Sequence, residues 1–274
     1  MLSILISLFL LLFSISLNAA PRVVVSIEPL AEISAQIMKG AGRPEVIIGI
    51  NQDPHHFALK PSHIRKLQSA DLVIWIDEHF ESGFNRVPEI LNDSTRQLML
   101  TDKIELPERH FHFWYSPDYL KKATSLISAT LSKLDPAYAE LYQNNANRQI
   151  QLIDTWEESQ ADFFKKKDLT VITDHDFLSA LTDHFGLAPL ESVHDQHDQA
   201  ASIKQVQYLT DYLKSGGTRC LLTLEPSLSK MARNLTSQFK LDIINVSPVG
   251  LDSTRPKLIF KRLDRLSKAL QQCS

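Results

Sequence analysis

Short apolar runs alternate with helical patterns in two separate parts of this chain, and this alternation most constrains its fold. In the first part the apolar runs cover residues 23–27, 45–50, 72–76 and 97–101. Helical patterns stand between them, at residues 30–38, 61–70 and 80–91. Strands that alternate with helices predict parallel strands joined by right-handed crossovers. The first part therefore predicts an α/β lobe with four strands.

The same alternation returns after residue 167. Apolar runs at 169–173, 190–193, 219–224 and 242–246 predict four more strands. Helical patterns are found at 177–185, 203–214, 227–239 and 257–271. Only the pattern repeats, because no residue-level similarity relates the two parts. The sequence thus predicts a second α/β lobe, again with a mainly parallel sheet flanked by helices.

The stretch between the two lobes is predicted to be helical. Ser116-Pro117 is a helix-start signal, and apolar residues then recur at steps of three and four up to Leu134. Asp135-Pro136 repeats that signal, and neither proline nor glycine occurs again before Gly186. An unbroken helix over residues 136–164 would be about 43 Å long, enough to join two lobes rigidly. We expect lobes at 20–115 and 168–274, with a helical connection at 116–167.

Residues 1–19 are interpreted as a cleaved export signal. Residues 4–17 are apolar and uncharged, and Asn18-Ala19-Ala20 supplies the small residues of a cleavage site. We expect cleavage after Ala19. A membrane anchor is the alternative, although the run is shorter than the roughly 20 residues that span a bilayer. Because no cysteine lies near the site, we expect no lipid modification.

Composition excludes some classes of function. Lysine and arginine total 29 against 32 acidic residues, a net charge of -3, which gives no basic footprint for nucleic acid. No later apolar run is long enough to span a membrane, so we expect the mature protein to be soluble and not membrane-embedded.

The chain has two cysteines, Cys220 and Cys273. Export to an oxidising compartment favours a disulfide between them, which would tie the last residues to an interior strand. A buried free thiol beside a terminal thiol is the alternative. A cysteine zinc site is excluded because the chain has no CxxC motif.

Histidines gather where the predicted strands end, which is where open parallel sheets bind ligands. Seven of the ten histidines lie there: His55, His56, His110, His112, His175, His194 and His197. Since both lobes contribute, the pattern predicts a metal site in a cleft between them. Imidazole ligands favour zinc over manganese or magnesium, which prefer oxygen. The carboxylates of Asp174 and Asp176 could orient the ring of His175, or could simply cap helices.

Several motifs resemble the cluster A-I metal-binding receptors of bacterial ABC importers. They are Val-Ser-Ile-Glu-Pro-Leu at 25–30, Asp-Pro-His-His-Phe at 53–57 with the segment 60–73, His-Phe-Trp-Tyr-Ser-Pro at 112–117, Thr-Asp-His-Asp at 173–176, Phe-Gly-Leu at 185–187 and Glu-Pro at 225–226. The resemblance covers essentially the whole mature chain. It implies two lobes joined by a rigid helix, a periplasmic location, and delivery of metal to a membrane permease by a protein expected to be monomeric.

The resemblance also implies a set of metal ligands. The positions of His55, His112 and His175 match the three zinc ligands of the family, which favours His55 over His56 and His112 over His110. The third position is a histidine in zinc receptors and usually a carboxylate in manganese receptors, so we expect Zn(II).

The chain departs from the family pattern in three places. Ser247-Pro248 stands where the family often has Asp-Pro, so Glu225, a water molecule or a neighbouring histidine could be the fourth ligand. The long loop rich in histidine and acids, common in zinc receptors before the second ligand, is missing, which leaves only His110. The pair His194 and His197 is unexpected and could form an auxiliary site or a solvated loop.

The expected function is capture of Zn(II) between the lobes and its delivery to an ABC permease, with no catalysis. A receptor for manganese or for a metal chelate, with the same fold, is one alternative. A zinc hydrolase is another, because three histidines and a water molecule also describe a catalytic site. The absence of HExxH and GxSxG motifs argues against the hydrolase.

Overall fold

The computed structural model of the protein describes residues 20–49, 52–166, 169–194, 202–224, 228–246 and 259–273. Some sequence predictions fall on other residues and so lie outside this part of the chain. They concern the export signal at 1–19, Glu225 as a ligand, His197 as an auxiliary ligand, and Ser247-Pro248.

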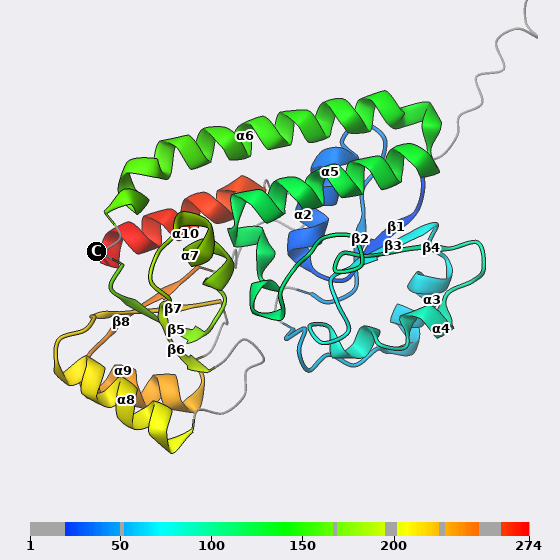
Figure 1. Ribbon diagram of the computed structural model, residues 1–274. Coiled ribbons are helices and arrows are strands. Elements are labelled where there is room, and N and C mark those ends of the chain that lie inside the picture. The colour runs from blue at the N-terminus through cyan, green and yellow to red at the C-terminus, as the bar shows by residue number, and fades with distance from the viewer. Residues whose placement is uncertain are drawn as a thin grey trace, which may run out of the picture.

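The first lobe is built on a four-stranded parallel sheet in the order β2-β1-β3-β4 (Figure 1). Its strands are β1 (Val23–Val25), β2 (Glu45–Val46), β3 (Leu72–Trp75) and β4 (Arg96–Met99). Its helices are α2 (Glu28–Ile37), α3 (Pro61–Gln68) and α4 (Val87–Ile90). The inner strands β1 and β3 are wholly buried, as expected of a parallel sheet covered on both faces.

The second lobe repeats this topology, with a parallel sheet in the order β6-β5-β7-β8. Its strands are β5 (Val171–His175), β6 (Glu191–His194), β7 (Cys220–Thr223) and β8 (Asp242–Asn245). Its helices are α7 (Ser179–Phe185), α8 (Ile203–Lys214), α9 (Lys230–Phe239) and α10 (Ile259–Cys273). The repeat of pattern in the sequence is therefore a repeat of strand order, and the predicted fold class is confirmed.

Two helices, α5 (Pro117–Leu134) and α6 (Ala139–Lys165), join the lobes (Figure 1). A short 3-10 turn, η4 (Pro136–Tyr138), separates them, so the second start signal begins α6 after one further turn. With 27 residues, α6 is about 40 Å long. It contacts α5, α2 of the first lobe and α10 of the second. The prediction of a long joining helix is confirmed.

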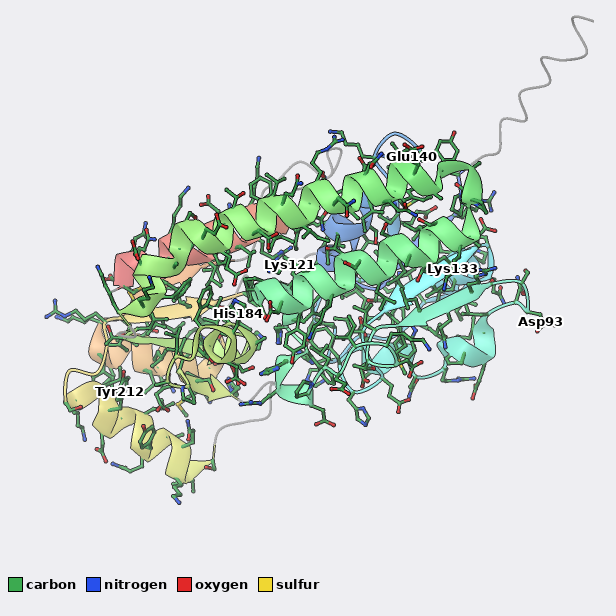
Figure 2. All side chains as sticks on the ribbon, turned by 45° about the horizontal axis from the view of Figure 1, so that its top comes forward. Asp93, Lys121, Lys133, Glu140, His184 and Tyr212 are labelled. Atoms are coloured by element: carbon green, nitrogen blue, oxygen red, sulfur yellow. A yellow bond between two sulfur atoms is a disulfide. The ribbon has the colours of Figure 1, made fainter. Side chains whose placement is uncertain are left out.

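Side chains of α5 and α6 separate by polarity. Apolar residues such as Leu120, Ile127 and Ile153 are fully buried. Charged residues such as Lys133 and Glu140 are exposed (Figure 2). Across the described residues, no helix is both long enough and apolar enough to cross a bilayer.

Two predicted elements of the first lobe are shorter in the structure. The run at 45–50 forms ladder pairs only over β2, although the amides of Ile47 and Ile48 still donate to the carbonyls of Val25 and Ser26. The helix expected over 80–91 is a 3-10 turn, η1 (Ser82–Phe84), followed by α4. A single helix would place Pro88 in its interior, where proline lacks the amide and clashes with the preceding turn.

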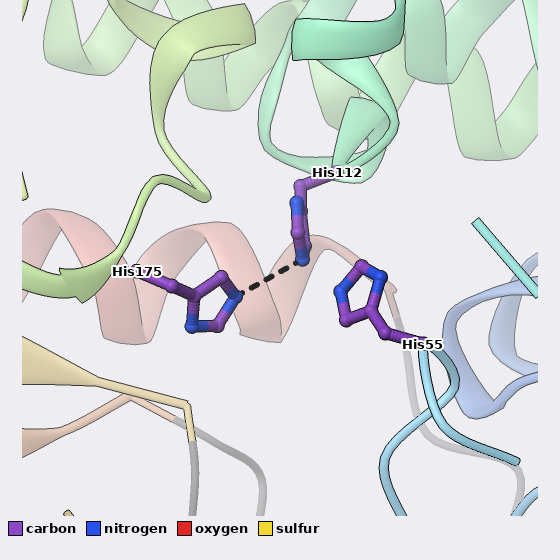
Figure 3. A group of neighbouring side chains, drawn as sticks. All are labelled: His55, His112 and His175. Atoms are coloured by element: carbon purple, nitrogen blue, oxygen red, sulfur yellow. Dashed lines mark hydrogen bonds between the residues drawn. The ribbon is translucent and has the colours of Figure 1, made fainter. Parts of the chain in front are cut away.

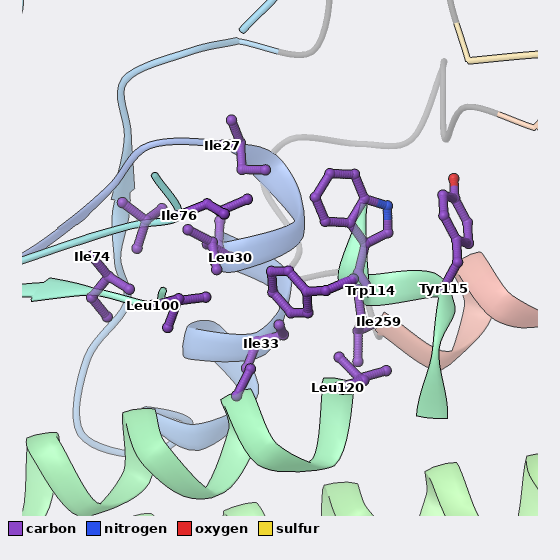
Figure 4. Packing of buried hydrophobic residues seen from close by; sticks show 14 of the residues in the cluster. Ile27, Leu30, Ile33, Ile74, Ile76, Leu100, Trp114, Tyr115, Leu120 and Ile259 are labelled. Atoms are coloured by element: carbon purple, nitrogen blue, oxygen red, sulfur yellow. The ribbon is translucent and has the colours of Figure 1, made fainter. Parts of the chain in front are cut away.

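One apolar core continues from the first lobe into the second. Figure 4 shows Trp114 and Tyr115 where α2 approaches α10, with Ile259 of α10 nearby. Trp114, Tyr115 and Ile259 are all buried. Since apolar side chains from both lobes share this core, the lobes are packed against each other rather than only tethered.

Candidate metal centre

His55 lies on the loop after β2, and that loop is held at three points. Asp53 Oδ1 accepts a hydrogen bond from the His55 amide at 2.8 Å, and Ser82 Oγ donates to the His55 carbonyl at 2.7 Å. A Cβ atom on Gly83 would lie 2.5 Å from the Phe57 carbonyl oxygen. Only glycine fits at that position, so η1 can press directly on the loop and fix His55.

His112 stands between two short 3-10 turns, η2 (Glu108–His110) and η3 (Phe113–Tyr115), just before α5. Its side chain is buried. The His112 ring lies 5.2 Å from the ring of Trp114 and 5.3 Å from that of Phe80. Phe80 also lies edge-on to His55, with the ring centres 4.7 Å apart. One buried phenyl ring therefore supports two of the three imidazoles.

His175 is the last residue of β5, an inner strand of the second sheet, and its side chain is buried. The acids on either side of it have other partners than its ring. Asp174 accepts hydrogen bonds from the amide and hydroxyl of Ser229 at the start of α9, and Asp176 accepts from the Ser179 amide at the start of α7. Both carboxylates are thus hydrogen-bonded to residues at the start of a helix.

The three side chains converge on one point (Figure 3). One nitrogen from each of His55, His112 and His175 lies within 4.8 Å of the others. His112 Nε2 and His175 Nε2 are 3.2 Å apart. Zinc–nitrogen bonds of about 2.0–2.1 Å in a tetrahedral site place two ligand nitrogens about 3.3 Å apart. The His112–His175 pair already has the spacing that such an ion requires.

The electrostatic environment keeps His175 in the form that can bind a metal. Burial lowers its pKa to about 3, and the nearby imidazoles of His55 and His194 act in the same direction. A neutral imidazole has a lone pair to offer a cation, whereas an imidazolium has none. At neutral pH, His175 is therefore unprotonated and ready to act as a ligand.

The three histidines line a cavity of about 100 Å³. Residues of both lobes line it, among them Glu28, Phe80, Leu224 and Arg262. Phe80 and Arg262 are not among the site residues predicted from the sequence. Their signals are weak, because an aromatic residue after a strand and an arginine in an amphipathic helix are both common.

The other predicted histidines that the structure describes, His56, His110 and His194, do not join this group. His56 is exposed. His110 is buried, with Nε2 2.9 Å from Asp183 Oδ2 and Nδ1 3.2 Å from the Tyr119 hydroxyl. His194 pairs in register with His175, but its Nδ1 lies 3.0 Å from the Asp174 carbonyl oxygen. Within the described residues, only His55, His112 and His175 form a group that could hold a metal ion.

Comparison with known proteins identifies the family of this chain. Residues 23–273 match the family model described as ZnuA, the periplasmic component A of a zinc-uptake complex. A relative from Brucella abortus (strain 2308), named high-affinity zinc uptake system protein ZnuA, is 23% identical over 303 residues, covering 92% of this chain and 91% of the relative.

Solved structures show the same fold. A mutant of the laminin-binding adhesin Lmb from Streptococcus agalactiae superposes with a TM-score of 0.79 at 18% identity, covering 93% of this chain and 100% of the other. A Mn-bound periplasmic metal-binding protein from Candidatus Liberibacter asiaticus gives a TM-score of 0.75 at 18% identity, covering 92% and 99%. With a family match over nearly all of its length, the chain belongs to the ZnuA family of metal-binding solute receptors.

Proposed function

We propose that the protein captures Zn(II) between its lobes and delivers it to the membrane permease of an ABC importer. The observation that supports this most strongly is the convergence of three imidazole nitrogens, within 4.8 Å of one another, two from the first lobe and one from the second. Borderline metals such as zinc prefer these nitrogen ligands. The name of the Brucella relative, a zinc uptake protein, supports the same ion.

In this proposal His55, His112 and His175 bind the ion, and the fourth position goes to a water molecule or to Glu225. His56, His110 and His194 take no direct part, since one is exposed and the other two have hydrogen-bond partners elsewhere. The proposal also includes an export signal cleaved after Ala19, a periplasmic, unlipidated monomer, and the division into lobes at 20–115 and 168–274.

Manganese and a metal chelate are the two alternative ligands for this fold. The Liberibacter protein of the same fold is Mn-bound, so the fold alone does not select the metal. Three nitrogen donors disfavour manganese, which prefers oxygen ligands. A metal chelate fits less well, because pockets that enclose drug-sized organic ligands measure roughly 300–1,000 Å³, whereas this cavity measures about 100 Å³.

A hydrolytic function has less support. The family and the fold are those of solute-binding receptors. Within the described residues the metal-binding group consists of three histidines, and in this proposal all three are ligands of a carried ion. We therefore propose a receptor and not an enzyme.

Calorimetric titration of the metal-free mature protein with zinc, and then with manganese, tests the proposal. We expect one zinc ion per chain, much weaker binding of manganese, and a loss of zinc affinity in His175→Ala that exceeds the roughly 10–100-fold cost of losing a residue that only supports a ligand. His56→Ala, which changes an exposed histidine beside the site, is the matched control and should bind zinc normally. Zinc binding that His175→Ala leaves intact would rule out this site.

A further inference from the structure

A buried ion pair joins the two lobes beside the cavity. Arg262 of α10 donates from Nε to Glu32 Oε2 at 3.1 Å and from Nη2 to Glu32 Oε1 at 2.9 Å. The two side chains are only 6% and 4% exposed. Glu32 belongs to α2 of the first lobe, so each partner comes from a different lobe. Two parallel hydrogen bonds fix both the distance and the orientation of the groups that they join.

The same ion pair is connected to the metal site. Arg262 lines the same cavity as His55, His112 and His175. The fully buried Tyr115 interacts with its guanidinium group. Tyr115 ends η3, the turn that begins directly after His112. A shift of α10 against α2 would therefore move both the cavity wall and the η3 turn, which begins directly after His112.

The charges of the pair also bear on a bound cation. A guanidinium group stays protonated in proteins, so Arg262 presents a permanent positive charge at the cavity. In a buried site that charge opposes a divalent cation unless a nearby anion offsets it. The carboxylate of Glu32 is placed to do so. Loss of Glu32 would leave an unbalanced positive charge, and loss of Arg262 an unbalanced negative one.

We propose that Glu32 is a positioning residue for the metal site: through Arg262 it sets the spacing of the lobes and neutralises the guanidinium group that faces the bound cation. This inference rests on the proposed function. It assigns a specific role in metal affinity to a residue that belongs to α2 and does not line the cavity.

The test compares Glu32→Gln, Arg262→Gln and the double variant with the wild type. Zinc affinity is measured by competition with a chromophoric zinc chelator, and the stability of each metal-free protein by thermal unfolding. Because both single variants break the tie between the lobes, a purely structural role predicts similar losses. A role through charge predicts that Glu32→Gln weakens zinc binding roughly tenfold or more, that Arg262→Gln weakens it less, and that the double variant recovers part of the loss.

Asp264→Asn is the matched control, because Asp264 pairs with Lys268 on the exposed side of the same helix. It should leave zinc affinity unchanged. If Glu32→Gln binds zinc like the wild type, or if the two single variants lose affinity equally and additively, the inference fails while the proposed function stands. If the wild type itself binds no zinc, the proposed function fails.

If Glu32→Gln does not fold, the zinc affinities of Arg262→Gln and of the double variant are compared to test whether Glu32 acts through its charge. The single variant keeps the Glu32 carboxylate near the cavity, whereas the double variant carries neither charge. Arg262→Gln should therefore bind zinc at least as tightly as the double variant. Tighter binding by the double variant would overturn the inference.

Discussion

His110 and His112 show how closely spaced residues of one type can have different roles. Both are buried, and both follow the last strand of the first sheet. The η2 turn directs His110 toward Asp183 of α7, whereas His112, between the two turns, points at His55 and His175. The strand-end pattern alone offers both, the family resemblance favours His112, and the backbone of the two turns gives them their different partners.

This difference predicts opposite outcomes for two substitutions. His112→Ala should remove zinc binding while leaving the chain folded. His110→Ala should keep zinc affinity within a few-fold, but should lower the free energy of unfolding by about 1–3 kcal/mol, because buried hydrogen-bond partners are left unsatisfied. Zinc titration and urea unfolding of both variants check this. Loss of zinc binding in both would mean that His110 also supports the ion.

Glu81 is a fully buried carboxyl group at the carboxyl ends of β1 and β3. Its Oε2 accepts hydrogen bonds from the amides of Ile76 and Asp77, and its Oε1 is hydrogen-bonded to the Ser26 hydroxyl. Burial raises its pKa from 4.5 to about 7. Between these values the folded protein keeps a proton that the unfolded chain has lost. The free energy of unfolding must therefore fall as the pH rises through this window.

The pH dependence gives a second prediction. Integrated over the window, the Glu81 contribution amounts to about 3 kcal/mol. Glu81→Gln cannot ionise, so it should gain stability relative to the wild type between pH 4.5 and pH 8, as measured by urea unfolding at both pH values. Glu89→Gln, at an exposed acid, should follow the wild type. Parallel curves for the wild type and Glu81→Gln would show that this carboxyl group does not titrate in that range.

At the scale of elements, the sequence predicted the strands and long helices well, because each has a local pattern of apolar residues that is typical of its type. It failed where tertiary contacts replace local ones. The run at 45–50 is apolar because Ile47 and Ile48 are buried, not because the ladder continues. The stretch 80–91 resembles a helix, yet its path follows the buried Glu81 carboxyl group and the contact of Gly83 with the Phe57 carbonyl.

The candidate site could be predicted for the same reason that the strands could. Parallel strands bring their carboxyl ends to one edge, so histidines that follow strands gather there. The roles of Glu32 and Phe80 could not be predicted, because they depend on how α2 meets α10 and on the orientation of a single ring. The apolar and small residues around Glu32, such as Ala31, Ile33 and Ser34, were the available hint that this helix is buried and that Glu32 needs a partner.

A disulfide joins Cys220 of β7 to Cys273 at the end of α10. Its partners are 53 residues apart, and closing such a loop in the unfolded chain corresponds to about 4 kcal/mol of stability. Replacing both cysteines with serine should lower the free energy of unfolding by about that amount, and reduction of the wild type should match it. Urea unfolding checks both. An unchanged midpoint would show that packing alone holds α10.

At the scale of the whole molecule, α6 and a polar network hold the lobes in place. His184 Nε2 of α7 lies 2.8 Å from Glu157 Oε1 of α6, and Lys121 Nζ of α5 lies 3.1 Å from Glu157 Oε2. With α6 also contacting α2 and α10, a wide hinge between the lobes would break contacts on both sides. Any change that accompanies metal binding should be confined to loops or to a small shift of the lobes.

Small-angle scattering tests this rigidity. Zinc-free and zinc-loaded protein should give nearly superimposable profiles, with a radius of gyration of about 18 Å in both states. Glu157→Ala, which removes the shared partner of His184 and Lys121, should widen the distribution of distances in the zinc-free protein. A clear compaction of the wild type on addition of zinc would mean that the lobes close like a hinge.

The shared strand order of the two sheets has a consequence for how the protein matures. His55 and His112 both belong to the first unit, and His175 ends a strand of the second. A nascent chain that has completed only its first unit lacks one of the three imidazoles. It therefore has an incomplete metal-binding group, and the last imidazole is supplied only when the second unit has folded against the first.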